Sequence, residues 1–253
     1  MTGEIVTTTS LSCKEFGEQR RTATAWLDYF NTNGKNLLPI PWDSPHSLSS
    51  HERAILDRSL KIFQLGESSE GHYLMKAARA YFAHSGDAVF IEVLKLFIFE
   101  EQRHARDLAR FMKQHHMLPI RTHWADTAFR KLRRLLNLEM SLTVLLTAEI
   151  VGLLYSRALS EVTQSPVLQQ LSRQIRHDEQ EHIRFQSVML GKLRQKRSPW
   201  LLALICGIHK LFLRATLGVV WLDHAPVFRA GGYSFRRFCS EACFELETAI
   251  KIM

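Results

Sequence analysis

The sequence predicts an all-α protein, an antiparallel four-helix bundle followed by one or two extra C-terminal helices. Two observations predict this fold. Apolar residues recur at spacings of three and four through long stretches of the chain, which is the period of an amphipathic helix. The 253 residues also include only 12 glycines and 7 prolines beside an apolar fraction of 46%. This composition is typical of a helix-rich globular protein with a sizeable core.

Residues 1–48 are expected to form an irregular N-terminal lead-in with at most one short helix. Pro39, Pro41 and Pro45 stand among Asn and Ser residues, a composition that favours loops. The first 21 residues mix charged residues with Thr and Ser and lack the apolar stretch of a secretory signal. We therefore expect no export.

The bundle is expected to span residues 49–197 and to contain four long helices. The first should run from about residue 50 to 84, where Ser85-Gly86-Asp87 signals a turn. The second should run from about 87 to 116 and end before Pro119. The third, over about 123–162, is the most apolar. The fourth should begin at Ser165-Pro166, an N-cap residue followed by proline, and reach about 196.

Residues 198–253 should form helices packed on the bundle. The apolar segment 200–222 is long enough to cross a membrane, for which roughly 20 residues are needed. His209, Lys210 and Arg214 at its centre disfavour a spanning helix. We expect a fifth helix packed on the bundle, with a helix lying in the plane of a membrane as the alternative. After Gly231-Gly232, a short helix should cover about 234–252.

Two copies of the pattern Glu-x-x-His carry the strongest functional signal. Glu101 and His104 form the first copy, Glu179 and His182 the second, and an acidic residue directly precedes each copy. Residues three apart lie on one face of a helix, so each copy offers a carboxylate oxygen and an imidazole nitrogen to the same point. Two such arms, together with one carboxylate from each of two other helices, make a two-metal site.

The two further carboxylates can also be found. Glu149 is the only charged residue between Ser141 and Ser156. A buried, unpaired carboxylate costs several kcal/mol, on the order of the penalty for a buried ion, so Glu149 needs a cation. On the first helix the candidates are Glu67 and Glu70, which lie one turn apart on the same face.

These residues resemble the ligands of the ferritin-like di-iron carboxylate superfamily, over about residues 50–196. The segment Leu65-Gly66-Glu67-Ser68 resembles the Gly-Glu-Ser of rubrerythrin's first helix, which favours Glu67 and keeps Glu70 as the alternative. Four carboxylates and two imidazoles suit iron or manganese better than zinc. The resemblance implies two iron ions, with manganese or a mixed pair as alternatives. The implied metal ligands are Glu67, Glu101, His104, Glu149, Glu179 and His182.

The resemblance also implies roles within the site. Glu101 and Glu179 would be the bridging carboxylates on which the chemistry depends. Glu100 and Asp178, the acids before them, look like the residues that accept the far N–H of a ligating histidine on a neighbouring helix. An orienting acid of this kind fixes the tautomer of the ring without binding the metal.

The function implied is that of a di-iron oxidoreductase, an oxidase or oxygenase that activates dioxygen and acts on an unidentified apolar organic substrate. There is no paired Cys-x-x-Cys domain of the rubrerythrin type, so an external electron donor is expected. A ferroxidase or iron-handling protein is an alternative, against which the net charge of +8 argues. A metal-free scaffold is another. Alternative oxidase and demethoxyubiquinone hydroxylase share the fold and sit on membranes, so a membrane-associated quinone-type hydroxylase or oxidase also stays open.

The remaining charge and cysteine patterns are less specific. Cys13, Cys206, Cys239 and Cys243 show no paired spacing, which favours a reducing, cytoplasmic setting. The basic clusters at 130–134 and 192–197 are interpreted as solvated helix faces. No nucleic-acid motif accompanies them, so no nucleic-acid partner is expected. The oligomeric state stays open, with a homodimer as one alternative.

Overall fold

The computed structural model describes residues 22–68, 71–85, 88–134 and 137–253. All regular secondary structure in these ranges is helical, which confirms the all-α prediction. The helices are α1 (Ala23–Asn33), α2 (Ser50–Glu67), α3 (His72–Ser85), α4 (Ala88–Gln114), α5 (Trp124–Arg134), α6 (Leu138–Val162), α7 (Pro166–Arg194), α8 (Pro199–Ala230) and α9 (Phe235–Ile252).

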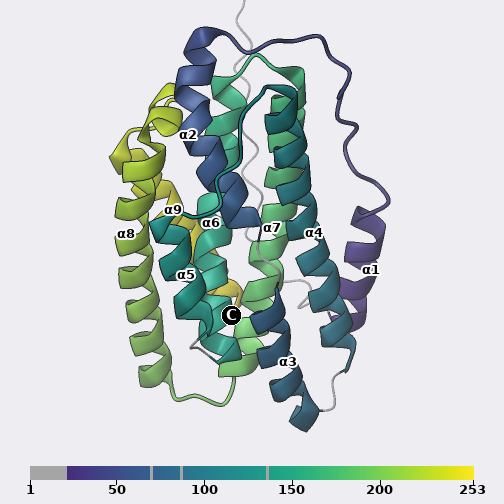
Figure 1. Ribbon diagram of the computed structural model, residues 1–253. Helices are drawn as coiled ribbons and strands as arrows, with labels where there is room; N and C mark the ends of the chain where they lie inside the picture. The colour runs from purple at the N-terminus through teal and green to yellow at the C-terminus, as the bar shows by residue number, and fades with distance from the viewer. Residues whose placement is uncertain (1–21, 69–70, 86–87, 135–136) are drawn as a thin grey trace, which may run out of the picture.

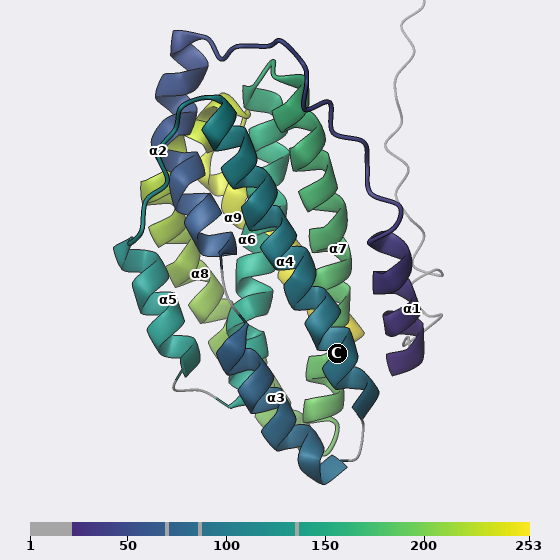
Figure 2. The same cartoon turned by 45° about the vertical axis from the view of Figure 1, so that its right-hand side comes forward.

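Four long helices form the centre of the molecule (Figure 1). Helix α6 packs along α7, α7 packs on α4, and α4 packs on α2. Helices α8 and α9 cover α6 on one side, while α1 lies against α4 on the other side (Figure 2). The shorter helices α3 and α5 each contact α6. The central helices therefore enclose a core that the peripheral helices cover.

A single first helix over 50–84 is wrong, because α2 ends at Glu67 and α3 begins at His72. Gly71 has a φ of +65°, a conformation that L side chains rarely adopt. A Cβ at this position would also lie 2.6 Å from the Ile98 side chain of α4. The chain therefore breaks where it must pass close to α4.

A single third helix over 123–162 is also wrong. Helix α5 ends at Arg134, and α6 begins at Leu138 after Asn137, whose backbone is extended and whose side chain accepts a hydrogen bond from Met140 N. Asn137 thus caps a new helix. The predictions for α4 and α7 are confirmed, including Ser165 as the N-cap residue of α7.

Among the described residues, α6 and α8 are long and apolar enough to cross a membrane. They differ in burial. The most apolar part of α6 is 83% buried, as expected for a core helix, but the corresponding part of α8 is only 22% buried. Helix α8 also extends beyond the predicted 200–222 segment, through Pro226 to Ala230. It packs on α2, α6 and α9 and leaves its other face exposed.

Candidate metal centre

The central helices bring the six predicted carboxylate and imidazole residues together. Glu67 is the last residue of α2, Glu149 lies in the middle of α6, and the two Glu-x-x-His copies lie on α4 and α7. They form two groups in which the atoms able to bind a metal lie within 4.8 Å of one another. The groups are Glu67, Glu101, His104 and Glu179, and Glu101, Glu149, Glu179 and His182. The arrangement offers two adjacent cation positions that share Glu101 and Glu179.

Each histidine turns the same ring nitrogen, Nδ1, toward three carboxylates. His104 Nδ1 lies 3.6 Å from Glu67 Oε2, and 3.7 Å from both Glu101 Oε1 and Glu179 Oε1. His182 Nδ1 lies 3.0 Å from Glu101 Oε1, 3.6 Å from Glu149 Oε2 and 3.7 Å from Glu179 Oε2. These atoms converge from four helices onto a small volume.

The other ring nitrogen of each histidine contacts an acid on the partner helix. His104 Nε2 lies 3.0 Å from Asp178 Oδ2 on α7, and His182 Nε2 lies 3.0 Å from Glu100 Oε2 on α4. Because a carboxylate accepts hydrogen bonds, each Nε2 carries a hydrogen, and with a cation bound each Nδ1 would present its lone pair to that cation. Without a cation, burial disfavours the charged rings, but the surrounding carboxylates outweigh it and raise the pKa of His104 to about 10 and that of His182 well above its ordinary value. The structure therefore places both acids where they can orient the rings.

The two orienting acids are themselves held by residues that the sequence analysis missed. Asn33 of α1 donates hydrogen bonds to Glu100 Oε1 (2.7 Å) and to Asp178 Oδ1 (2.8 Å). Gln174 and Arg103 also donate to Asp178. Arg103 and Gln174 lie on the helices that carry the motifs, so helical spacing could have identified them. Nothing in the sequence signalled Asn33.

Glu149 is supported in a similar way. Gln186, one helical turn after His182, donates a 2.6 Å hydrogen bond to Glu149 Oε1. Burial raises the pKa of Glu149, but hydrogen bonding with Glu179, the neighbouring His182 and, to a smaller extent, the bond from Gln186 outweigh it and lower this pKa to about 2. Burial and the nearby Glu149 and Glu67 have the opposite effect on Glu101, whose pKa rises to about 7. The carboxylates thus repel one another in the absence of a cation.

Five of the cluster's buried polar atoms have no hydrogen-bond partner in the described part of the chain. Such atoms are rare in folded proteins, and each needs an explanation. They are Glu67 Oε2, Glu101 Oε1, Glu179 Oε2, His104 Nδ1 and His182 Nδ1. All five belong to the two groups described above, and each would offer a lone pair to a divalent cation that displaces the histidine protons. Buried carboxylates and histidines of this kind are compatible with a metal site.

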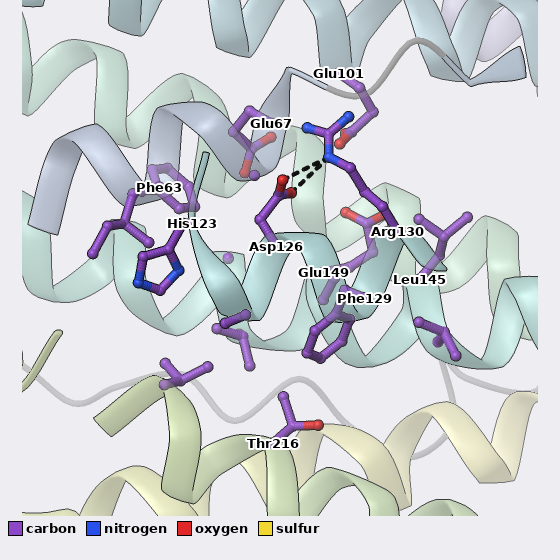
Figure 3. Close-up of a pocket in the computed structure, with 18 of the residues that line it drawn as sticks. Phe63, Glu67, Glu101, His123, Asp126, Phe129, Arg130, Leu145, Glu149 and Thr216 are labelled. Atoms are coloured by element: carbon purple, nitrogen blue, oxygen red, sulfur yellow. Dashed lines mark hydrogen bonds and ion pairs between the residues drawn. The ribbon is translucent and has the colours of Figure 1, made fainter. Parts of the chain in front are cut away.

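A cavity of about 370 Å³ reaches the cluster (Figure 3). Four of the clustered carboxylates line it: Glu67, Glu101, Glu149 and Glu179. Aromatic and aliphatic side chains from α2, α4, α5, α6 and α8 form much of its wall. Asp126 and Arg130 of α5 also line it and are joined by two hydrogen bonds of 2.7 and 2.8 Å. The cluster is therefore buried in protein but adjoins a largely apolar space.

Other residues considered from the sequence lie elsewhere. Glu70 and Cys13 fall outside the described residues. The prediction that both basic clusters are solvated helix faces is wrong for Arg194. Arg194 is buried and donates to Glu139 and Thr143, because α7 ends against α6.

Comparison of this chain with protein-family models, curated proteins and solved structures finds no significant match. The interpretation of the cluster therefore rests on its own geometry and chemistry.

Proposed function

We propose that this chain is a ferritin-like di-metal carboxylate protein that holds two iron ions, with manganese or a mixed pair as alternatives. The observation that carries the proposal is the convergence of five unpartnered, buried ligand atoms on two adjacent positions. Glu101 and Glu179 belong to both groups and would bridge the ions. The charges of four carboxylates match those of two divalent cations, and the mixed oxygen and nitrogen donors suit iron or manganese.

We further propose that the protein is an oxidoreductase acting on an apolar organic substrate. Two ferrous ions would supply the chemistry, since they can reduce dioxygen. The protein's own part is to orient the ligands and exclude water. Phe97 and Phe185 lie in the buried core, and the ring of Phe97 contacts that of His182 with centroids 4.8 Å apart. The apolar cavity beside Glu101 favours an organic substrate over the hydrated iron that a ferroxidase takes.

Metal analysis tests the first part. Protein expressed in iron-replete medium should hold about two metal ions per chain, as two-metal carboxylate bundles do. Glu149→Ala and His182→Ala should lose them, because each removes a ligand from a buried group. Full metal retention by both variants would refute the ligand assignment.

Dioxygen reactivity tests the second part. Mixing the ferrous protein with dioxygen in a stopped-flow instrument should give a transient visible absorbance change and dioxygen uptake. Glu101→Ala should abolish both, since it removes a carboxylate common to the two groups. If the ferrous protein is stable in air for hours, the oxidoreductase assignment must be dropped, although the metal site would stand.

We also propose that α8 lies in the plane of an anionic membrane surface. Five large apolar residues of this helix are each more than half exposed: Trp200, Leu204, Ile208, Leu211 and Leu222. The first four follow one another at spacings of four, four and three, so they share one face. Arg214 and Arg229 are exposed on the same helix, whereas its one acidic residue, Asp223, is buried. An apolar face with cations at its side matches the interface of an anionic bilayer.

Vesicle sedimentation tests this contact. The protein should bind phosphatidylglycerol vesicles more strongly than phosphatidylcholine vesicles, and the double variant Leu204→Glu, Ile208→Glu should lose binding. Phe99→Glu, a matched change at an exposed position on α4, should keep it. Binding that resists alkaline carbonate extraction would indicate a spanning helix. Equal binding by the double variant and the wild type would refute the assigned face.

A further inference from the structure

One side of the cavity carries polar side chains that are not among the proposed metal ligands. His123 of the segment before α5, and Asp223 and His224 of α8, line the cavity together with its apolar wall. In Figure 3, His123 lies beside Phe63 at the left of the cavity, whereas Glu101 and Glu149 lie farther to the right. The cavity therefore joins the carboxylate cluster to a second, separate polar region.

Hydrogen bonding fixes the state of His224. Ser59 Oγ lies 2.8 Å from both Tyr155 Oη and His224 Nδ1, and all three residues are buried. Only one arrangement uses both hydroxyl hydrogens: Tyr155 donates to Ser59, and Ser59 donates to Nδ1. Burial also lowers the pKa of His224 to about 4, so the ring is neutral. A neutral ring that accepts at Nδ1 carries its hydrogen on Nε2.

The Nε2–H of His224 is then a donor beside the cavity without a hydrogen-bond partner among the described residues. A ligand group that meets it must be an acceptor. Asp223, next to His224 in the chain, disfavours an anionic acceptor, because its carboxylate lines the same cavity. The nearby groups that can be cationic already face acids: Arg58 and His123 lie 2.8 and 3.4 Å from the Asp223 carboxylate, and Arg130 is paired with Asp126. The complementary group is therefore an uncharged oxygen.

We infer that the cavity binds a neutral, largely apolar molecule with one carbonyl or hydroxyl oxygen, which accepts a hydrogen bond from His224 Nε2. The apolar wall holds the body of the molecule. The bound oxygen positions that body between His224 and the carboxylate cluster. The inference rests on the proposed function, since it names the class of substrate for the same site. The volume of about 370 Å³ lies within the range of small-molecule sites.

Three ten-carbon probes test the inference: decanone, decane and decanoate. Their affinities can be measured by displacement of Nile red from the metal-loaded protein. Decanone should bind roughly two- to tenfold more tightly than decane, the gain expected from one net hydrogen bond. Decanoate should bind most weakly. His224→Phe should remove the preference for decanone and leave decane unchanged, whereas His224→Gln, which retains an N–H donor, should restore part of it.

His209→Phe is the matched control. His209 is also buried on α8 and bonded to a hydroxyl group, Thr147 Oγ1 at 3.0 Å, but it does not line the cavity. This variant should keep the preference for decanone. Equal affinity for decanone and decane in the wild type, or an unchanged preference in His224→Phe, would overturn the inference. If decanoate binds most tightly of the three probes, the inference that the ligand is uncharged would be overturned.

Metal content measured on the same samples separates this inference from the proposed function. Protein that holds its metals but does not bind Nile red or decanone would overturn the ligand inference alone. Protein that lacks metals but prefers decanone would support the ligand site and count against the metal proposal.

Discussion

The two halves of the cluster use the same residue types in very different surroundings. Helices α2 and α4 supply Glu67, Glu101 and His104, and helices α6 and α7 supply the equivalent Glu149, Glu179 and His182. The carboxylates of the first half are 10% and 17% exposed, against 4% and 1% in the second half. A repeat in the sequence therefore does not make the two halves of the cluster equivalent.

For Glu67 and Glu149, the difference in exposure comes from how far the helix continues past the residue. Helix α6 is unbroken on both sides of Glu149 and packs along α7. Gln186 of α7 donates a hydrogen bond to the carboxylate of Glu149. Helix α2 ends at Glu67, whose Oε2 has no hydrogen-bond partner in the described residues. We therefore expect the position beside Glu149 and His182 to bind metal more tightly. The position beside Glu67 and His104 should exchange its ligands more readily.

The largest expected effect is on metal stoichiometry. Glu149→Ala and His182→Ala should lose both metals, because they open the half that anchors the site. Glu67→Ala should keep about one, because the group of Glu101, Glu149, Glu179 and His182 stays complete. Metal analysis after desalting measures both. Loss of both metals in Glu67→Ala as well would remove the distinction between the halves.

The next largest expected effect is a loss of metal affinity when an orienting acid is replaced, and this loss should be larger for Asp178 than for Glu100. Asp178 accepts hydrogen bonds from four side chains, those of Asn33, Arg103, His104 and Gln174. Burial would raise its pKa, but the neighbouring His104 and Arg103 outweigh this and hold it well below its usual range. Asp178→Asn should therefore lower metal affinity by about 10- to 100-fold, the range for residues that orient a ligating histidine.

Glu100→Gln is the matched change in the other half and should have a smaller effect on metal affinity. Its hydrogen-bond partners among the described residues are Asn33 and His182, so fewer contacts are disturbed. Competition with a coloured chelator gives both affinities. A larger loss in Glu100→Gln would show that contact number does not set the importance of these acids.

Removal of the metals should destabilise the half with Glu67 and Glu101 more than the half with Glu149 and Glu179. Chelation leaves the carboxylates facing one another, and their repulsion destabilises the cluster. We expect the melting temperature to fall, and amide hydrogen exchange to increase more around Glu67 and Glu101 than around Glu149 and Glu179. The reason is that α2 ends at the site, whereas α6 and α7 pack together on both sides of it. Hydrogen exchange with and without chelator, followed by mass spectrometry, tests this.

The features that could be predicted from the sequence are local. Glu-x-x-His places two side chains on one helix face whatever surrounds the helix, and Glu149 is conspicuous because its neighbours in the chain are apolar. The N-cap at Ser165 likewise depends on adjacent residues only. These patterns sufficed to select six residues that the structure brings together.

The features that could not be predicted depend on contacts between distant segments. The break after Glu67 reflects the close approach of Gly71 to Ile98, which helical periodicity does not encode. Asn33 reaches the cluster because α1 packs on α4, with Phe30 stacked on His182 at a centroid distance of 6.1 Å. The hydrogen bonds of His224 likewise join α2, α6 and α8. Contacts of this kind join residues far apart in the sequence, so they can be identified only once the three-dimensional structure is known.

The smallest expected effects come from substitutions at two glycines, one in each half of the cluster. A Cβ at Gly152 of α6 would lie 3.3 Å from Glu179 Oε1, whereas a Cβ at Gly66 of α2 would have no neighbour within 4 Å. Alanine in place of glycine in a helix favours folding by about 0.5–1 kcal/mol. Gly66 is the penultimate residue of α2, so Gly66→Ala should show at most this gain in denaturant unfolding and leave metal affinity unchanged.

Gly152→Ala should behave differently, because the gain in helix propensity is opposed by the contact with Glu179. The carboxylate must move by a few tenths of an ångström, and the close packing of α6 on α7 gives it little room. We expect little net change in the free energy of unfolding and a severalfold loss of metal affinity, measured by chelator competition. If Gly152→Ala instead matches Gly66→Ala in both measurements, the α6–α7 half is more adaptable than its burial indicates, and burial does not explain the difference between the two metal positions.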